Sequence, residues 1–333
     1  MSSAVLSVRN LSVSVHTDLG LARVVDRLSF SLRSGEILGL VGESGCGKSI
    51  TAAALMGLVP SPAGIVTADQ VMLGDKNLTQ LDEASLRRVR GSEISMIFQE
   101  PLTALDPVFS IGGQLSTVIR RHRGENRYQA RRSSVEMLER VGMADTHRIM
   151  QSYPHQLSGG MRQRVMIAMA MACRPRVLIA DEPTTALDVT TQAQVLEQLS
   201  ELGQSFGTAI LLITHDLGVV AQACDRALIM YCGRIVEEAP VEALFAAPAH
   251  PYTAGLLAAV PRISSAQVQR VQAIPGLVPH PAALPDGCHF ADRCARADPQ
   301  CRTLTPRMQA VDGLKSIHRR ACHHPLSSPS HAD

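Results

Sequence analysis

The stretch that most constrains this chain is a short run of glycines and small polar residues, Gly42-Glu43-Ser44-Gly45-Cys46-Gly47-Lys48-Ser49. An apolar run at residues 36–41 precedes it, and residues 50–56, which are rich in helix formers, follow it. Glycines let the backbone curl so that successive N–H groups point inward, and the start of a helix adds its positive end. The pattern G-x-x-x-x-G-K-S between a strand and a helix predicts a phosphate-binding loop, in which Lys48 reaches the β- and γ-phosphates and Ser49 ligates Mg²⁺.

Polar side chains follow three further apolar strands of the predicted sheet. Asp181 and Glu182 come directly after the run at 176–180, Gln99 follows the run at 94–98, and His215 follows the run at 209–214. An aspartate at such a strand end can hold Mg²⁺ through water, and the next acid can polarise an attacking water. Asp181 and Glu182 are therefore candidates for these two roles, although paired acids at a strand end are also common solvated loop residues.

Strands and helices alternate along most of the chain. Strands are expected at 5–15, 24–32, 36–41, 65–78, 94–98, 176–180, 209–214 and 227–231, and helices at 50–56, 110–150, 161–172 and 189–202. Such alternation predicts an α/β fold with a parallel sheet that is covered on both faces.

Composition limits the classes of protein to consider. The chain has 333 residues, of which 45% are hydrophobic, so it can bury a sizeable core. Its net charge of +2 gives no electrostatic footprint for a nucleic-acid partner. No apolar run approaches the roughly 20 residues of a membrane span, and the N-terminus lacks the pattern of a signal peptide. We therefore expect a cytosolic chain that reaches a membrane only through a partner.

A second phosphate-reading stretch is decisive, Leu157-Ser158-Gly159-Gly160-Met161-Arg162-Gln163. It places a serine hydroxyl and two exposed backbone amides at the start of a helix, which is a second anion site. Two such sites in one chain suggest a sandwich in which each subunit completes the site of the other. With this loop, with Gln99, with Thr185-Ala186-Leu187-Asp188 and with His215 in the same order, the chain resembles the ATP-binding subunits of ABC transporters over residues 1–245.

The resemblance implies a P-loop NTPase fold with a RecA-like parallel sheet core, an antiparallel β subdomain and a helical subdomain at about residues 100–170. It also implies transport-coupled ATP hydrolysis. Glu182, His215 and Gln99 would be catalytic, with His215 at the γ-phosphate and Gln99 beside Mg²⁺, water and the permease. The residues implied to contact ATP or its Mg²⁺ are Gly42, Ser44, Gly45, Cys46, Gly47, Lys48, Ser49, Ile50, Gln99 and Asp181. Ser158 and Gly160 would act on the ATP of a partner subunit, and Asp188 would lie at the dimer seam.

One position departs from the family pattern. The family usually stacks adenine on an aromatic residue ahead of the phosphate loop, and the only aromatic hydrocarbon ring there is Phe30, which we expect in a core strand. Val15, His16 or Leu21 would have to take that place, so the adenine contact is left open.

Beyond residue 245 the composition shifts to many prolines, and four cysteines appear with the spacing C-x5-C-x6-C-x20-C: Cys288, Cys294, Cys301 and Cys322. Eight cysteines in a cytosolic chain favour free thiols or metal over disulfides. Four thiolates suit tetrahedral Zn²⁺ or an iron–sulfur cluster, and the spacing lacks the C-x2-C pairs that are typical of structural zinc. We expect residues 246–333 to form a separate, loop-rich module with little core of its own. Cys46 lies at a helix start, which could lower the pKa of its thiol.

Three further motifs narrow the family. They are Glu100-Pro101-Leu102-Thr103-Ala104-Leu105-Asp106-Pro107, His250-Pro251-Tyr252-Thr253-Ala254-Gly255-Leu256-Leu257 and Gly287-Cys288-His289-Phe290-Ala291-Asp292-Arg293-Cys294. They resemble the dipeptide/oligopeptide/nickel importer branch. That branch implies a second, homologous ATPase subunit, two transmembrane permeases, a substrate-binding protein, and a location on the cytoplasmic face of the inner membrane. It also implies a 4Fe–4S cluster at the four cysteines, with Zn²⁺ as the alternative.

Other functions compete with this interpretation. Within the same branch the solute could be nickel or another small molecule. A soluble ABC-type ATPase acting on nucleic acid or ribosomes usually carries two ATPase halves, a coiled-coil insertion or a basic surface, none of which the sequence has. A redox or metal sensor remains conceivable only as an added layer on the ATPase.

Overall fold

The computed structural model describes residues 4–99, 104–185, 187–260, 273–311 and 317–326. The chain forms two compact units: one comprises Met1–Ser7, Ser31–Ile37 and Met72–Ile213, and the other Val8–Phe30, Leu38–Val71 and Thr214–Asp333. The phosphate loop belongs to the second unit, together with the whole C-terminal region.

The first unit contains three parallel strands. β7 (Ile94–Ile97) pairs with β8 (Val177–Asp181), and β8 pairs with β9 (Ala209–Thr214). Every residue of β8 and β9 is buried, as expected for strands covered on both faces. Because parallel strands end at the same edge of a sheet, the polar residues that follow β7 and β8 come out on one side. The short antiparallel pair β5 (Gln70–Leu73) and β6 (Lys76–Asn77) precedes these strands in the sequence.

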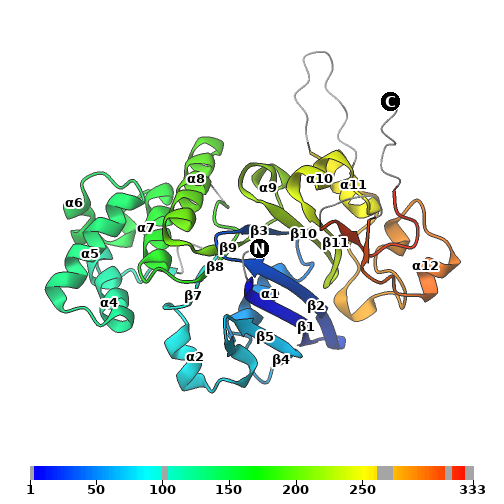
Figure 1. The fold of residues 1–333 in the computed structure, drawn as a ribbon, viewed down its shortest axis with the longest axis horizontal. Coiled ribbons are helices and arrows are strands. Elements are labelled where there is room, and N and C mark those ends of the chain that lie inside the picture. Colours follow the sequence, from blue (N-terminus) through cyan, green and yellow to red (C-terminus); the bar gives the residue numbers. More distant parts are fainter. Residues whose placement is uncertain (1–3, 100–103, 186, 261–272, 312–316, 327–333) are drawn as a thin grey trace, which may run out of the picture. The chain divides into compact units, whose positions relative to one another are not determined.

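The helices of the first unit are capped by residues that the sequence supplies at each end. Ser110, Asn126, Ser158 and Asp188 accept backbone hydrogen bonds at the starts of α4, α5, α7 and α8, and Gly124 and Gly207 end α4 and α8 in the left-handed conformation. α4 packs against α5 and α6 (Figure 1). The helices are α2 (Glu83–Val89), α4 (Ile111–Arg123), α5 (Arg127–Arg140), α6 (Thr146–Gln151), α7 (Gly159–Met171) and α8 (Val189–Phe206).

The second unit combines a parallel pair with antiparallel neighbours. β3 (Ile37–Val41) pairs in parallel with β10 (Arg226–Tyr231), and β10 pairs antiparallel with β11 (Arg234–Pro240). β11 pairs antiparallel with β13 (Arg319–Arg320), which pairs with β12 (Gln309–Ala310). In the same unit β1 (Ala4–Thr17), which is followed by β2 (Gly20–Arg33), pairs antiparallel with β4 (Gly64–Thr67).

Helices of the second unit are shorter. They are α1 (Lys48–Leu55), α9 (Leu217–Ala223), α10 (Val241–Ala246), α11 (Pro251–Ala258) and α12 (Pro299–Thr303). α1 starts directly at the phosphate loop, as the sequence predicts, and α11 starts at Pro251 with His250 as its cap. No helix in the described part of the chain has the length and apolar content to cross a membrane.

The C-terminal region shares its core with the strands of the second unit. Tyr231 of β10 lies edge-on to Tyr252 of α11, with ring centroids 4.7 Å apart, and to Phe290, with centroids 5.2 Å apart. Ile274, Val278, Leu284, Cys288 and Cys294 pack against the same buried cluster. This differs from the expected separate module with little core, because the tail's few apolar residues complete a core begun by β10. The predicted boundary at residue 245 stays a prediction.

Candidate functional site

The phosphate loop has the backbone geometry that its glycines predict. Gly45 and Gly47 have positive φ angles of 80° and 106°, and Gly47 is the N-cap of α1. A Cβ at Gly47 would lie 2.5 Å from the carbonyl oxygen of Val24, and a Cβ at Gly42 would lie 2.2 Å from that of Met230. The loop therefore needs glycine at Gly47 for both conformation and space, and at Gly42 for space.

The lysine of the loop is held by the loop itself. Lys48 is buried, and its Nζ donates to the carbonyl oxygens of Gly42 at 2.8 Å and of Glu43 at 3.0 Å. Ser44, Gly45 and Ser49 are exposed and Ile50 is half-buried, so the mouth of the loop at the start of α1 is open. The open backbone turn and the ammonium group suit the triphosphate of a nucleotide, and Ser49 at the start of α1 stays the predicted Mg²⁺ ligand.

Cys46 contributes backbone to this loop and not a reactive thiol. Its side chain is buried, and burial raises the pKa of the thiol, while the nearby Lys48 charge acts in the opposite direction. The expectation of a lowered pKa at this helix start is therefore wrong, because desolvation outweighs the favourable charges.

In the first unit, the structure brings two predicted catalytic residues together. The side-chain amide of Gln99 donates to Glu182 Oε2 at 3.1 Å, and the hydroxyl of Thr185 donates to the same oxygen at 2.9 Å. Glu182 has a positive φ of 47°, which is uncommon outside glycine. Asp181, the last residue of β8, is buried beside it in the sequence. Both acids thus stand at the carboxyl end of a parallel strand, where a water and a metal ion are expected.

The second phosphate-reading stretch forms an exposed helix start. Ser158 is the N-cap of α7 and accepts a hydrogen bond from the Met161 amide at 3.4 Å. A Cβ at Gly159 would meet open space, whereas one at Gly160 would lie 3.0 Å from Thr191 Cγ2. The exposed hydroxyl and amides are available to an anion from outside the unit, as the composite-site hypothesis requires.

His215 and the candidates for the adenine contact occupy the second unit. His215 is exposed and follows the last residue of β9. Phe30 is buried within β2, as expected. Of the alternatives for adenine, Val15 is half-buried, whereas His16 and Leu21 are exposed.

The four late cysteines line one pocket, together with His250, His323 and His324. Burial raises the pKa of Cys288, Cys301 and Cys322, that of Cys322 to about 11. Among the described residues, one group has metal-ligand atoms that all lie within 4.8 Å of one another and could hold a metal ion: Asp298, Cys301 and His324. Of the four cysteines, Cys301 belongs to that group.

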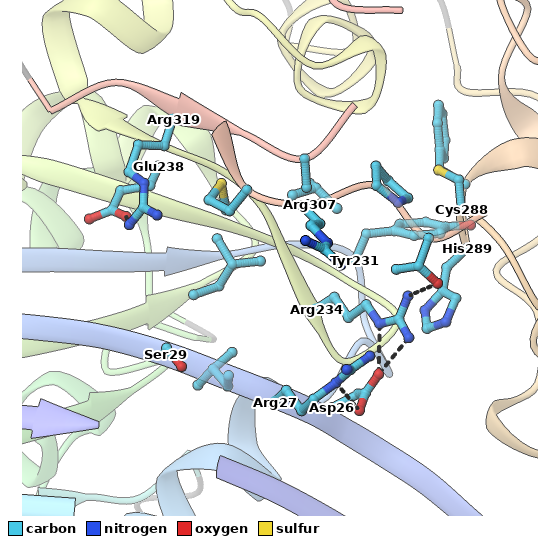
Figure 2. A pocket seen from close by; sticks show the side chains of 18 of the residues that line it. Asp26, Arg27, Ser29, Tyr231, Arg234, Glu238, Cys288, His289, Arg307 and Arg319 are labelled. Carbon is cyan, nitrogen blue, oxygen red and sulfur yellow. Dashed lines mark hydrogen bonds and ion pairs between the residues drawn. The ribbon is translucent and has the colours of Figure 1, made fainter. Parts of the chain in front are cut away.

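A polar cavity of about 350 Å³ lies beside Cys288 and His289 (Figure 2). Arg234 crosses it and pairs with Asp26 at 2.6 Å, and its other nitrogen donates to Thr305 at 3.3 Å. Arg319 faces Glu238 across 4.0 Å. Asp26 also pairs with Arg23 and Arg27, and Glu238 also pairs with Arg226, so arginines outnumber acids around the cavity. These ion pairs join β11 to β2 and to β13.

Sequence reasoning missed three residues at the phosphate loop. Glu43, within the loop, is ion-paired with Arg293 and donates its backbone N–H to Tyr252, and both partners belong to the C-terminal region. Asp298 near Cys301 was also missed. No spacing could have found the contacts of Glu43, since Arg293 lies 250 residues from it in the sequence.

Two family profiles match this chain: "ABC transporter" at residues 25–185 and "Oligopeptide/dipeptide transporter, C-terminal region" at residues 236–301. The chain is 50% identical to the oligopeptide transport ATP-binding protein AppD of Bacillus subtilis, over 92% of this chain and 93% of that protein. It is 45% identical to the dipeptide transport ATP-binding protein DppD of Escherichia coli, over 97% of both.

Solved structures agree on the fold. The ATP-binding cassette MJ0796, in a dimeric post-hydrolysis state bound to ADP and Pi, superimposes with a TM-score of 0.63 at 25% identity, over 71% of this chain and 98% of that one. These similarities confirm the resemblance that the phosphate loop and the LSGGMRQ stretch predict. The chain has the ABC-type P-loop ATPase fold and belongs to the ABC transporter ATP-binding proteins, in the branch with the oligopeptide/dipeptide transporter C-terminal region.

Proposed function

We propose that this chain is the energy-coupling ATPase of a membrane importer for di- and oligopeptides. The observation that carries the proposal is the match to peptide-transport ATP-binding proteins over more than nine-tenths of both chains, C-terminal region included. Nickel or another small solute is the alternative within the same branch, and the transport experiment below separates the two.

The residues divide the work of hydrolysis. The phosphate loop, with Lys48, would hold the triphosphate. As the family resemblance implies, Ser49, Asp181 and Gln99 would hold Mg²⁺, which would neutralise developing charge on the phosphates. Glu182 orients and polarises the attacking water. Its hydrogen bonds from Gln99 and Thr185 support this role, because they fix the direction of the carboxylate that must meet the water. His215 contacts the γ-phosphate.

The working form pairs this chain with a second, homologous ATPase subunit. Ser158 and Gly160 then close on the partner's ATP, and the exposed start of α7 supports that role. The pair sits on the cytoplasmic face of the inner membrane beneath two permeases, which a substrate-binding protein supplies. The exposed apolar side chains of Val108 and Phe109, a short distance after Gln99 in the sequence, support a permease contact there.

The four cysteines would hold a 4Fe–4S cluster, with Zn²⁺ as the alternative. Four thiols that line one pocket are the donor set that such a cluster needs. The cysteine thiols there are free, and metal binding would release their protons. When bound, the cluster would tie Cys288 and Cys294 to Cys301 and Cys322.

Metal analysis tests the cluster. Protein purified without oxygen should be brown and should absorb broadly at about 400 nm, because of thiolate-to-iron charge transfer. It should also contain iron and sulfide in excess of zinc. Cys294→Ser should bleach the colour, while Cys173→Ser, outside the pocket, should not. A colourless protein with one zinc per chain would replace the cluster by zinc, and a metal-free protein would exclude both.

Transport tests the function. The chain is co-purified with its membrane partners and reconstituted in vesicles with the binding protein, and uptake of a labelled tripeptide and of Ni²⁺ is measured with ATP inside. ATP-dependent tripeptide uptake supports the proposal. Uptake of Ni²⁺ alone would assign the nickel alternative, and ATP hydrolysis stimulated by RNA without any membrane partner would overturn import.

A further inference from the structure

Glu43, inside the phosphate loop, is held at each of its polar groups. Its carbonyl oxygen accepts from Lys48 Nζ at 3.0 Å, the group that is to meet the phosphates. Its backbone N–H donates to the Tyr252 hydroxyl at 3.0 Å, and its carboxylate accepts two hydrogen bonds from Arg293, at 2.6 and 3.0 Å. The position of Lys48 therefore depends on a residue that two side chains of the C-terminal region fix.

Arg293 is built into place and is not a surface residue that happens to lie nearby. Its side chain is 5% exposed, and its Nε donates to the Pro275 carbonyl oxygen at 2.9 Å. The guanidinium carbon lies 5.8 Å from the centroid of the Tyr231 ring and 6.0 Å from that of Phe290. A planar, bidentate pair on an aromatic support fixes direction as well as distance, and lysine cannot reproduce it.

A second contact runs from the same segment to the other side of the loop. His289 Nδ1 lies 2.9 Å from the Cys232 carbonyl oxygen, and the next residue, Gly233, donates its N–H to the Cys46 carbonyl oxygen at 2.9 Å. Figure 2 shows His289 next to Cys288 at the edge of the polar cavity. His289 and Arg293 both lie between Cys288 and Cys294, two of the pocket's four cysteines.

We propose that the segment between Cys288 and Cys294 positions the phosphate loop, with Arg293 as the principal positioning residue, so that the state of the cysteine pocket sets the affinity for nucleotide. When the segment between Cys288 and Cys294 is ordered, Arg293 stays paired with Glu43. The Gly42 and Glu43 carbonyl oxygens then keep the positions in which they accept hydrogen bonds from Lys48. When the cysteine pocket is disordered, Arg293 and His289 both lose their contacts. The phosphate loop must then become ordered when ATP binds, which lowers the affinity for ATP. Coupling of the pocket to nucleotide rests on the proposed cysteine site, whereas the Arg293 contact does not.

The first test measures nucleotide affinity of the full-length chain by titration with a fluorescent ATP analogue, alongside its melting temperature. Arg293→Ala should weaken binding about tenfold, within the range of ordinary coupling between sites. Arg293→Lys and Glu43→Gln should lose less, and the double variant Glu43→Gln/Arg293→Ala should bind no worse than Arg293→Ala alone. Arg132→Ala is the control, because it breaks an exposed arginine–acid pair with Glu136 on α5, outside the C-terminal region.

Affinity within twofold of wild type in Arg293→Ala, Arg293→Lys and Glu43→Gln would overturn the proposal, even if the melting temperature fell. So would an equal loss in Arg132→Ala. If Arg293→Ala does not fold, the charge-conserving Arg293→Lys and the isosteric Glu43→Gln decide.

The second test concerns the pocket. Cys294→Ser should weaken binding of the analogue in the wild-type background by a similar factor, but add nothing in the Arg293→Lys background, where the link is already loosened. Equal losses in both backgrounds would show that the pocket does not act through Arg293. These measurements use no transported solute, so they do not depend on whether the importer carries peptides.

Discussion

Glu182 has a strained backbone conformation that its neighbours maintain. A non-glycine residue with a φ of 47° costs on the order of 1–3 kcal/mol, and it persists only where surrounding contacts fix it. Here the backbone N–H of Glu182 donates to the Ile213 carbonyl oxygen at 2.9 Å, while Gln99 and Thr185 hold the side chain. These contacts keep the carboxylate in one place at the end of β8.

Glu182→Gln should bind ATP normally but lose hydrolysis by about a hundredfold or more, since general-base assistance contributes roughly 10²–10⁴-fold. The amide keeps the size of the side chain but cannot take a proton from water. Steady-state phosphate release by the assembled transporter measures it, with Glu201→Gln on the exposed side of α8 as the control. Turnover within twofold of wild type would remove Glu182 from this role, once the partner subunit's own site has been silenced.

At the scale of elements, the N-termini of α7 and α11 differ in exposure and in what their capping residues contact. α7 begins at an exposed serine and two glycines, which leaves its positive end open. α11 begins at His250, which is buried and whose Nδ1 accepts from the Tyr252 amide at 3.0 Å. The first start leaves its amides open to solvent, and the second places the Tyr252 hydroxyl 3.0 Å from the Glu43 amide of the phosphate loop.

Ser158→Arg should leave ATP binding to this chain's own loop within about twofold and abolish closure of the ATPase pair, because a bulky cation then fills the place of the partner's γ-phosphate. ATP-dependent dimerisation in the Glu182→Gln background, followed by size-exclusion chromatography, measures closure. Ser205→Arg near the far end of α8 is the control. Loss of nucleotide binding by the isolated Ser158→Arg chain would contradict a site shared between subunits.

The buried cap of α11 predicts a pH dependence of folding stability. Burial lowers the pKa of His250 from 6.5 to about 4, so between these values the unfolded chain binds a proton that the folded chain does not. The contribution of neutral His250 to the free energy of unfolding is fully present above pH 6.5. It declines as the pH falls toward 4, by about 3 kcal/mol at most. His250→Asn keeps a capping acceptor but removes this titration.

Chemical denaturation at several values of pH measures the effect as a difference. The free energy of unfolding of wild type minus that of His250→Asn should decrease as the pH is lowered from about 6.5 to about 4.5. A difference that stays constant with pH would mean that His250 is not the group responsible.

Local sequence signals predicted the elements that carry the nucleotide motifs, because continuous apolar strands and glycine loops are read from neighbouring residues. The strands expected at 94–98, 176–180 and 209–214 are observed as β7, β8 and β9, and Asp181 is the last residue of β8. The helix α2 was missed, since Glu83–Val89 has little apolar periodicity. The bond from Arg293 to Glu43 and the pairing of β11 with β13 could not be predicted, because both depend on packing between residues far apart in the sequence.

On the scale of the whole molecule, function requires surfaces that meet other chains. Val108 is 71% exposed and Phe109 58% exposed, and both precede α4. Large apolar side chains exposed side by side are unfavourable in water unless a partner covers them. Their place after Gln99 suits a contact that reports on the permease.

Phe109→Asp should bind ATP as wild type does but fail to co-purify with the permeases, because a charge is then buried in an apolar contact. Ile65→Asp in β4 replaces a similarly exposed apolar side chain and serves as control. Affinity purification of the tagged chain from membranes, with the permeases quantified, measures it. Undiminished recovery with Phe109→Asp would place the permease contact elsewhere.

The pairing of β13 with β11 also has a consequence for biosynthesis. Arg319 and Arg320 come near the end of the chain, yet they pair with Glu238 and Glu237, made much earlier. At ribosomal speeds of about 5–20 residues per second, the edge of β11 waits about 4–16 s for its neighbour. During that time Glu237, fully buried in the finished protein, lacks the ring of His318, 2.7 Å away. A truncated mRNA that ends before these codons would therefore yield a chain in which the edge of β11 is unpaired and Glu237 lacks its contact with His318. We expect cellular proteases to degrade such a chain.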